Sequence, residues 1–311
     1  MRKVIGIGET ILDVIFRDDR PHVAVPGGST FNCMVSLSRL GLPVAFISEL
    51  GNDRVGEMIR NFMQSNGMTT EYIGCFPDRK SPVSLAFLNR SKDAEYIFYT
   101  DYPLQRLDVP FPVINEDDIL VFGSFYALNG ELHERITDLL EYAKLRKAII
   151  YYDPNFRKTH AHEAIRVRST VMDNYEYAGI VRGSDEDFFN LYGKTDMDIV
   201  YREEVEFYCK RLITTHGAGG VNLYTEKIRA HFDVAPVTPL STVGAGDNFN
   251  AGIIYGLIKY GVGYHDLPQL GERTWEKIIR HGMEFASEVC LSYDNYISTE
   301  FAAKYGIETN G

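Results

Sequence analysis

Short apolar segments alternate with amphipathic segments along most of this chain, and this alternation limits the folds that it can adopt. Residues 4–8 and 44–50 are apolar runs typical of buried strands, whereas residues 30–40 and 55–66 carry apolar side chains at helical spacing. The same pattern returns later, with predicted strands and a helix at 119–122, 131–145, 148–152 and 212–215. Strands that alternate with helices predict an α/β fold, with a mostly parallel central sheet covered by helices on both faces.

Two segments interrupt this alternation and predict a second, smaller sheet. Residues 10–25 and 82–102 carry consecutive strand patterns, and the polar turn 89–95 joins the two strands of the second segment. Strand pairs inserted into an α/β chain suggest a small sheet that stands off the main domain. Such a sheet could act as a lid, as a dimerisation surface, or as both. We therefore expect one α/β domain over residues 1–311, with a β lid inserted from about 10–26 and 82–108.

Charge and cysteine content argue against several classes of function. The 311 residues carry a formal net charge of −11, whereas a nucleic-acid or anionic-membrane surface needs a basic footprint. No apolar run approaches the length that spans a bilayer. The four cysteines are scattered without metal-ligand spacing, so we expect reduced thiols, as in a cytoplasmic enzyme.

A glycine-rich turn leads directly into a predicted helix near the C-terminal end of the chain. Residues 241–247 read Ser-Thr-Val-Gly-Ala-Gly-Asp, and apolar residues at helical spacing follow them. Gly244 and Gly246 have no Cβ, so backbone N–H groups can approach a ligand closely. A helix that begins here adds free N–H groups and the positive end of its dipole. Gly244, Ala245 and Gly246 are therefore predicted to form an anion hole for a phosphoryl group in transfer.

Asp247 follows this turn, and two roles are open to it. An aspartate in the first turn of a helix is commonly a stabilising residue without a chemical role. The preceding glycines favour catalysis instead, because an aspartate that only stabilises a helix start does not need exposed backbone N–H groups beside it. The helix N-terminus is expected to lower the pKa of Asp247 and weaken it as a base. Phosphoryl transfer tolerates a weak base, since it relies mainly on positioning and charge stabilisation. Asp247 is thus predicted to be the catalytic base.

The chain resembles a known family in two separate places. The pattern Thr-x-Gly-Ala-Gly-Asp, followed by an aromatic residue and Ala-Gly, resembles the C-terminal signature of the ribokinase-like (PfkB) carbohydrate kinases. Residues 27–32, 37–41 and 51–56 are similar to the family's N-terminal signature, with its paired glycines, an asparagine and an Arg-Leu-Gly helix end. The resemblance covers nearly the whole chain and implies a ribokinase-like fold with a small β lid.

The resemblance implies a sugar site. Asp13, Gly28 and Asn32 match family residues that contact sugar hydroxyls, and such groups can both donate to and accept from a polyol. Residues 153–157 are similar to the Asp-x-Asn-x-Arg segment of fructokinases and 2-keto-3-deoxygluconate kinases. Arg157 would then face the substrate or the transferring phosphate, unless it is a structural surface arginine.

The resemblance also implies ATP and Mg²⁺ as cofactors. Thr215, Gly217 and Gly220 match the family's nucleotide-phosphate segment, Thr-x-Gly-x-x-Gly. Ser184 occupies the asparagine position of the family's Asn-x-x-Glu motif, which organises water around magnesium and the phosphates. Cys290 and Asn295 fall in the C-terminal helix region that borders adenine in relatives.

The chain departs from the family pattern at three positions. Ser184 replaces the motif's asparagine, and Asp187 replaces its glutamate, so that the carboxylate is kept but shortened. Asp187 would therefore act on the metal through water, with an altered geometry. Ser241 stands where relatives usually carry an aspartate, which in several of them helps to bind a monovalent cation. This exchange puts potassium activation in doubt.

The predicted activity is ATP-dependent phosphorylation of a sugar hydroxyl. In 2-keto-3-deoxygluconate kinases an arginine often follows the lid tyrosine and pairs with the substrate carboxylate. Here Thr100 and Asp101 follow Tyr99, and a carboxylate substrate would meet Asp101. We therefore expect fructose or a related neutral sugar. A 2-keto-3-deoxygluconate kinase or a nucleoside kinase of the same family remains the alternative.

Two other classes of protein also remain open. A dinucleotide-dependent oxidoreductase would fit the alternation, but Gly6-x-Gly8 lacks the third glycine of that fingerprint. A P-loop is incomplete as well, because Phe188 stands where its first glycine should precede residues 193–195. The second class is a sugar-binding protein that has lost catalysis, which the three departures suggest. The retained Gly-Ala-Gly-Asp run argues against it.

Overall fold

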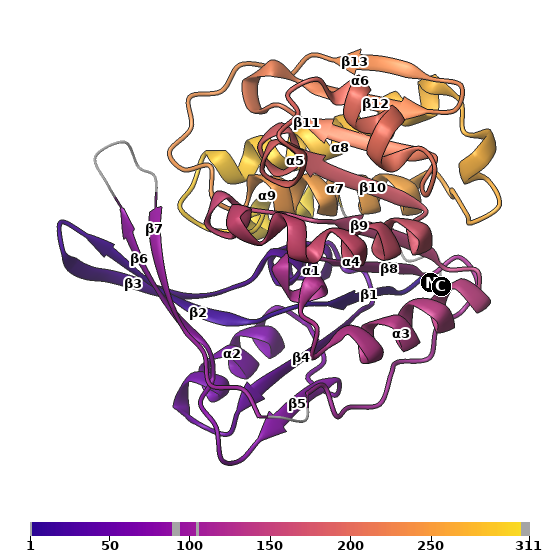
Figure 1. Ribbon diagram of the computed structural model, residues 1–311. Helices are drawn as coiled ribbons and strands as arrows, with labels where there is room; N and C mark the ends of the chain where they lie inside the picture. The colour runs from indigo at the N-terminus through magenta and orange to yellow at the C-terminus, as the bar shows by residue number, and fades with distance from the viewer. Residues whose placement is uncertain (1, 89–93, 104–105, 306–311) are drawn as a thin grey trace.

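The computed structural model describes residues 2–88, 94–103 and 106–305. Within these residues, nine strands form one large sheet in the order β13-β12-β11-β10-β9-β8-β1-β4-β5 (Figure 1). Their bounds are β1 Val4–Ile7, β4 Val44–Gly51, β5 Ile73–Phe76, β8 Ile119–Gly123, β9 Ile149–Asp153, β10 Ile180–Ser184, β11 Arg211–Thr215, β12 Val221–Thr225 and β13 Arg229–Phe232. Neighbours from β5 to β11 pair in parallel, whereas β12 and β13 at one edge pair antiparallel.

The central strands are buried along their whole length, as parallel strands covered on both faces must be. Every residue of β1, β8 and β9 is buried, and their sequences are rich in valine, isoleucine and aromatic residues. These side chains fit a pleated and fully covered surface, which is why the short apolar runs of the sequence form strands.

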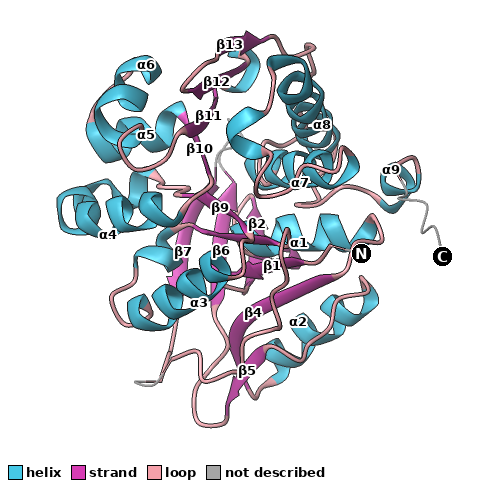
Figure 2. Cartoon of the chain, turned by 90° about the vertical axis from the view of Figure 1, so that its right-hand side faces the viewer, coloured by secondary structure: helices cyan, strands magenta, loops and turns pink. Residues whose placement is uncertain are grey.

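Helices cover both faces of the large sheet (Figure 2). Two separate apolar cores result, one with Phe31, Ile253 and Trp275, the other with Leu139 and Val171. The first face carries α1 Ser29–Arg39, α2 Arg54–Ser65, α7 Ala245–Lys259, α8 Glu272–Cys290 and α9 Thr299–Ala303, and the second carries α3 His133–Leu145, α4 Ala164–Tyr177, α5 Asp185–Tyr192 and α6 Met197–Val200. The predicted α/β fold with a mostly parallel, doubly covered sheet is confirmed.

A smaller sheet stands away from the main body of the protein (Figure 1). Among the described residues it has four strands in the order β3-β2-β6-β7, with β2 and β6 parallel and the outer pairs antiparallel. The expected second sheet is thus present, whereas most of the predicted turn 89–95 lies outside the described residues. The strands are β2 Ile11–Arg17, β3 Arg20–Gly27, β6 Val83–Leu88 and β7 Ala94–Tyr99.

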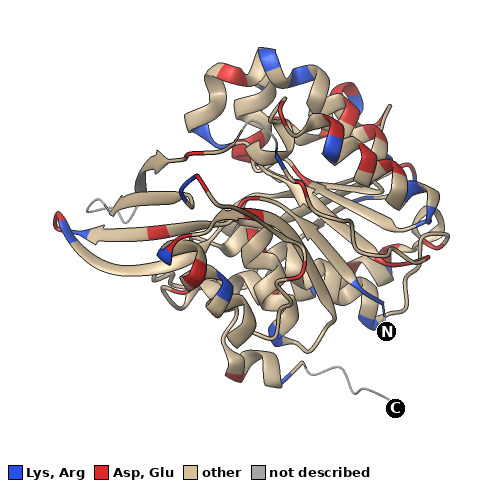
Figure 3. Cartoon of the chain, turned by 90° about the horizontal axis from the view of Figure 1, so that it is seen from below, with Lys and Arg blue, Asp and Glu red and all other residues tan. Residues whose placement is uncertain are grey.

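The surface carries charged residues of both signs. Figure 3 shows lysine and arginine interspersed with aspartate and glutamate along the helices. In the part of the chain that the structure describes, no helix is both long enough and apolar enough to cross a membrane.

Candidate active site

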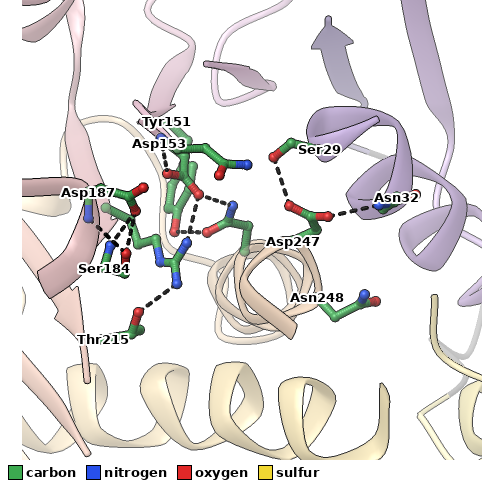
Figure 4. A network of polar contacts seen from close by, with 12 residues as sticks. Ser29, Asn32, Tyr151, Asp153, Ser184, Asp187, Thr215, Asp247 and Asn248 are labelled. Atoms are coloured by element: carbon green, nitrogen blue, oxygen red, sulfur yellow. Dashed lines mark hydrogen bonds and ion pairs between the residues drawn. The ribbon is translucent and has the colours of Figure 1, made fainter. Parts of the chain in front are cut away.

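The predicted site residues gather at the edge of the large sheet where its parallel strands end. Asp153, Ser184 and Thr215 are the last residues of β9, β10 and β11. Because these neighbouring strands are parallel, their carboxyl ends lie side by side. The N-terminus of α7 reaches the same region and brings Asp247 to it (Figure 4). Ligands of open α/β sheets bind at this edge.

Asp247 connects the start of α7 to the start of α1. Its side chain points toward Ser29 and Asn32 (Figure 4). The Ser29 hydroxyl donates to Oδ1 at 2.7 Å, and the Asn32 amide donates to Oδ2 at 2.8 Å. Asp247 is 4% exposed, and this burial raises its pKa against the opposing effects of Asn32, Ser29 and Arg157. The expectation of a lowered pKa at a helix start is therefore wrong, because desolvation outweighs the groups that favour the charged form.

The turn before Asp247 needs glycine at its first position. Gly244 has φ 79°, and a Cβ there would lie 2.8 Å from the carbonyl oxygen of Asn295. No side chain of the described residues caps this helix end. The Ala245 N–H donates to the Thr242 carbonyl oxygen at 3.3 Å, which leaves the next N–H groups of α7, those of Gly246 and Asp247, available to a ligand. Asn248 holds the turn in place, since its amide donates to the carbonyl oxygens of Gly244 and Asn295, both at 2.8 Å.

On one side of Asp247 lie the residues that were predicted to bind sugar. The Ser84 hydroxyl of β6 donates to Asp13 of β2. Burial raises the pKa of Asp13 to about 6, whereas the Ser84 bond and the Arg157 charge act to lower it. Arg157 itself is exposed, and its charge acts on both Asp13 and Asp247. Asp13 lies in β2 and Ser84 in β6, and Arg157 lies in the segment that follows β9.

Gly28 and Asn32 complete this side of the site. Gly28 has φ 132°, and a Cβ there would lie 2.2 Å from the carbonyl oxygen of Glu9, so only glycine fits at the start of α1. Asn32 is 5% exposed, and its Oδ1 is buried without a hydrogen-bond partner among the described residues. A buried acceptor of this kind calls for a donor from a ligand or from water.

On the other side of Asp247 the structure forms a cavity of about 490 Å³. Five predicted residues line it, namely Thr215, Gly217, Gly220, Ala245 and Gly246. The remaining wall is mostly apolar, and it includes Val234, Pro236, Val237, Phe249, Met283, Ala286 and Cys290. A cavity of this size with few polar groups is typical of a site for a small organic ligand.

Asn295 lies away from this cavity, although its sequence position suggested an adenine contact. It is 5% exposed and sits beside the glycine turn, where its carbonyl oxygen accepts from Asn248. Its amide nitrogen would lie 3.7 Å from a Cβ placed on Gly27. The structure therefore places Asn295 next to Gly27 and the glycine turn, whereas Cys290, which was predicted for the same region, does line the cavity.

Ser184 and Asp187 form a capping box at the start of α5 (Figure 4). The Asp187 carboxylate accepts from the Ser184 backbone N–H at 2.7 Å and from its hydroxyl at 2.6 Å. Burial, and then the charge of Asp153, raise the pKa of Asp187 to about 6. Oδ2 of Asp187 is thus hydrogen-bonded within the N-terminus of α5.

The sequence interpretation missed Arg182, a buried arginine in β10. Arg182 is 5% exposed, and it donates to Asp153 at 2.8 Å and to the Thr215 hydroxyl at 2.6 Å. The segment 180–184 was not predicted as a strand. An arginine that directly follows the apolar pair Ile180-Val181 was the signal available, because a buried arginine is costly unless it is paired. The Asp153 carboxylate also accepts from Asn250 at 2.7 Å.

Asp101 does not have the position that the sequence suggested. The Arg79 side chain donates to it at 3.0 Å, and the backbone N–H of Lys80 donates to it at 3.3 Å, both at the exposed surface. Asp101 is therefore not placed to repel a carboxylate substrate.

A family model described as "pfkB family carbohydrate kinase" matches residues 1–301 of the chain. The chain belongs to this family. It is a carbohydrate kinase, and the two resemblances found at residues 27–56 and 241–252 are those of its family.

Relatives of this pfkB kinase include several fructokinases. A fructokinase of Rhizobium leguminosarum bv. trifolii is 28% identical over 264 residues, covering 82% of this chain and 79% of the relative. The probable chloroplastic fructokinase-6 of Arabidopsis thaliana is 27% identical over 297 residues, covering 91% and 75%. A crystal structure of Vibrio cholerae O395 fructokinase, bound to fructose, ADP and calcium ion, has a TM-score of 0.84 at 19% identity and covers 98% of this chain and 99% of that one. This structural likeness shows a shared fold.

Proposed function

We propose that this pfkB kinase transfers the terminal phosphoryl group of ATP to a hydroxyl of a neutral sugar, with fructose or a related sugar as acceptor. The position of Asp247 carries this proposal. Its carboxylate lies against the sugar-side residues Ser29 and Asn32, while Ala245 and Gly246 of the same turn line the cavity. The segment 245–247 thus borders both the expected sugar site and the expected nucleotide site.

The acidic character of the sugar side supports a neutral acceptor. The charges of Glu9 and Asp247 both act to raise the pKa of the buried Asp13, so the three carboxyl groups lie close together. Sugar hydroxyls donate to carboxylates, whereas the carboxylate of an acid substrate would be repelled by them. The charge of Arg157 acts on Asp13 and Asp247, and the charge of Arg106 acts on Glu9. A sugar hydroxyl would also supply the donor that the buried Oδ1 of Asn32 lacks.

The cavity supports a nucleotide as phosphoryl donor. Its apolar wall can cover the two faces of an adenine ring, and the glycines of the segment 215–220 leave room for backbone contacts to phosphates. The similar fructokinase of V. cholerae was crystallised with ADP and fructose. We place the base of ATP between the apolar residues and its phosphates at the start of α7.

The geometry suggests separate roles in the reaction for Asp247 and for the glycine turn before it. As a sugar hydroxyl oxygen bonds to the terminal phosphorus, the bond to the departing ADP breaks, and Asp247 accepts the hydroxyl proton. Its raised pKa makes Asp247 a stronger proton acceptor than an exposed aspartate. The N–H groups of Gly246 and Asp247 donate to the phosphoryl oxygens and stabilise their charge, while the Ala245 N–H holds the turn through its bond to the Thr242 carbonyl oxygen. In a loose transition state, this stabilisation lowers the barrier more than early proton removal does.

Mg²⁺ would act mainly on the nucleotide. Among the described residues no group of three or more His, Cys, Asp or Glu side chains could hold a metal ion. Mg²⁺ in kinases keeps several waters and binds substrate phosphates, where it neutralises charge. Asp187 is the carboxylate that we propose to reach such an ion through water, with Ser184 beside it. The Ser241 hydroxyl accepts from the Val243 backbone N–H at 3.2 Å. The proposed mechanism does not require a monovalent cation.

We further propose that the small sheet acts as a lid over the sugar. It contributes Asp13 and Ser84 to the sugar side, so a movement of this sheet would move the binding groups themselves. Its strand β7 exposes Ile97 (43%) and Tyr99 (58%), which suits contact with a second copy of the sheet. The four cysteines are free thiols, which suits a cytoplasmic enzyme.

A coupled ADP-release assay tests the proposed activity. Wild-type protein with ATP and Mg²⁺ would be given fructose, other neutral hexoses, a ribonucleoside and 2-keto-3-deoxygluconate, each over a range of concentrations. We expect the highest kcat/KM with fructose or another neutral sugar. Sugar binding without ATP turnover would show a protein that has lost catalysis, and binding of NADH without ATP would contradict a kinase.

A further inference from the structure

Arg182 lines the cavity beside the turn that carries Asp247. Of the described residues that line the 490 Å³ cavity, Arg182 is the single one with a charged side chain. It is 5% exposed, so its charge is largely shielded from water. Electrostatic interactions are stronger in such surroundings than at the surface. A buried cation in an apolar cavity is suited to an anionic ligand.

The guanidinium is held rigidly by residues from neighbouring strands and from α7. Asp153 accepts from its Nη1 at 2.8 Å, and Thr215 accepts from its Nη2 at 2.6 Å. Asp153 is fixed in turn, because its carboxylate also accepts from the Asn250 side chain at 2.7 Å and from the Asn155 backbone N–H at 3.0 Å. These bonds use only part of the N–H donors of a guanidinium, so donors remain for a ligand.

The guanidinium also lies directly against the anion hole. A Cβ placed on Gly246 would be 3.0 Å from Nη1 and 3.3 Å from Nη2 of Arg182. The first N–H groups of α7 and the guanidinium therefore border the same small volume. The N-terminus of a helix and the remaining N–H donors of an arginine that is paired with Asp153 meet there.

Arg182 supplies a positive charge that Asp187 cannot supply. A carboxylate acts on phosphate charge only through a bound metal ion, and Oδ2 of Asp187 accepts two bonds from Ser184. Burial tends to lower the pKa of Arg182, but the charges of Asp153 and Asp187 outweigh burial and raise it, so the guanidinium stays protonated.

We propose that Arg182 is a phosphate-contacting residue that donates to the terminal phosphates of the bound nucleotide. Asp153 and Thr215 are its positioning residues, and Asn250 holds Asp153 in place. A planar guanidinium can bond two phosphate oxygens at once, which fixes the phosphoryl group in line with the sugar hydroxyl. This inference rests on the proposed use of ATP, and it adds a residue that acts on the donor rather than on the sugar.

Nucleotide binding to Arg182→Met tests the inference. Isothermal titration in EDTA, with adenosine, ADP and a non-hydrolysable ATP analogue, isolates the charge of the protein from that of a metal ion. We expect the ATP analogue and ADP to bind about 10- to 100-fold more weakly than to the wild type, because bonds to charged groups are lost. Adenosine, which has no phosphate, should bind with unchanged affinity.

Arg106→Met is a matched control for the loss of a buried ion pair. Arg106 is also 5% exposed, and it pairs with Glu49, which is 4% exposed, outside the residues that line the cavity. Both variants should lower the thermal unfolding temperature, but only Arg182→Met should weaken ADP binding. Arg182→Lys keeps the charge without the planar fork, and we expect it to restore part of the affinity for ADP.

Each outcome of these titrations decides one point. If Arg182→Met binds ADP as tightly as the wild type, or loses adenosine and ADP affinity equally, Arg182 is a structural residue and the inference is overturned. If Arg182→Met does not fold, Arg182→Lys decides, since wild-type ADP affinity in that variant would overturn the planar contact. If wild-type protein binds no nucleotide even when Mg²⁺ replaces EDTA, the proposed kinase reaction fails first, and the two failures are thereby distinguished.

Discussion

The two sides of the α7 N-terminus hold their polar groups in different ways. On the sugar side, the carboxylates of Asp247 and Asp13 accept bonds from Ser29, Asn32 and Ser84. On the nucleotide side, the cavity wall is mostly apolar, and among the described residues Arg182 is its single charged side chain. The sugar side is therefore a set of oriented acceptors, whereas the nucleotide side is an apolar surface with one cation.

This difference indicates where selectivity and affinity arise. Buried groups that need a hydroxyl partner reject ligands that lack it, because those groups are then left unpaired. An apolar surface contributes affinity in proportion to the area that it covers, with little discrimination. We therefore expect the choice of sugar to depend on Asp13 and Asn32, and the strength of nucleotide binding to depend on the cavity wall and Arg182.

The largest expected effect on activity comes from substitution of Asp247, which lies between the sugar side and the nucleotide side. Asp247→Asn keeps the shape of the side chain but removes the proton acceptor, so kcat for sugar phosphorylation should fall by about 10³-fold. Binding of fructose and of ADP, measured by titration, should change little. Asp118→Asn is a matched control, since Asp118 is 2% exposed and accepts from the backbone N–H groups of Lys3 and Asn115 away from the site. A normal kcat in Asp247→Asn would remove Asp247 from the chemistry.

A change confined to the sugar side should separate the two substrates. Asp13→Asn replaces a charged acceptor by an amide, and the KM for fructose should rise by roughly 10- to 100-fold because charge-assisted hydrogen bonds are lost. The affinity for ADP should remain that of the wild type. Equal weakening of both substrates would show that Asp13 acts on the fold rather than on the sugar.

A change confined to the nucleotide side should give the converse result. Ala286 of α8 lines the cavity, and Ala286→Phe would fill part of it. ADP should bind on the order of tenfold more weakly, since the added ring competes for the same space. Fructose binding should stay unchanged. Unchanged ADP affinity would mean that the nucleotide base lies elsewhere.

The smallest expected effect is a pH dependence of the sugar side. Asp13 has a pKa of about 6 in the folded protein, raised by burial, so it is charged at pH 7.5 and loses that charge as the pH falls through 6. Fructose affinity should therefore weaken by roughly fourfold between pH 7.5 and pH 5.5, because the neutral acid is a poorer acceptor. The matched control is Asp13→Asn, whose own fructose affinity should vary less over this range. An identical pH profile in both proteins would assign the titration to another group.

The local elements and the glycine turn could be predicted because each depends on neighbouring residues. The apolar run 44–50 became β4, and the helical pattern 55–66 became α2, within about one residue at each end. The Gly-Ala-Gly-Asp run predicted a helix start, and α7 begins at Ala245. Backbone preferences and the spacing of apolar side chains act over a few residues, so the sequence displays them directly.

The roles of single polar residues were predicted less well, because their partners lie far away in the chain. Asn32 is 215 positions from Asp247, which it bonds, and burial by such distant elements is what raises the Asp247 pKa. Asp101 was expected to face the substrate, but it pairs with Arg79 at the surface. Asn295 was expected near adenine, but it supports the glycine turn.

By itself, the sequence determined the α/β fold, the small second sheet, the family and the segment that carries Asp247. Those features follow from local patterns and from motifs whose residues are adjacent in the chain. Only the tertiary structure decided that Arg182 pairs with Asp153, 29 positions away, and with Thr215, 33 positions away, beside the same glycine turn. Parallel strands bring their carboxyl ends together whatever their distance in sequence, and no local pattern records which side chains then meet.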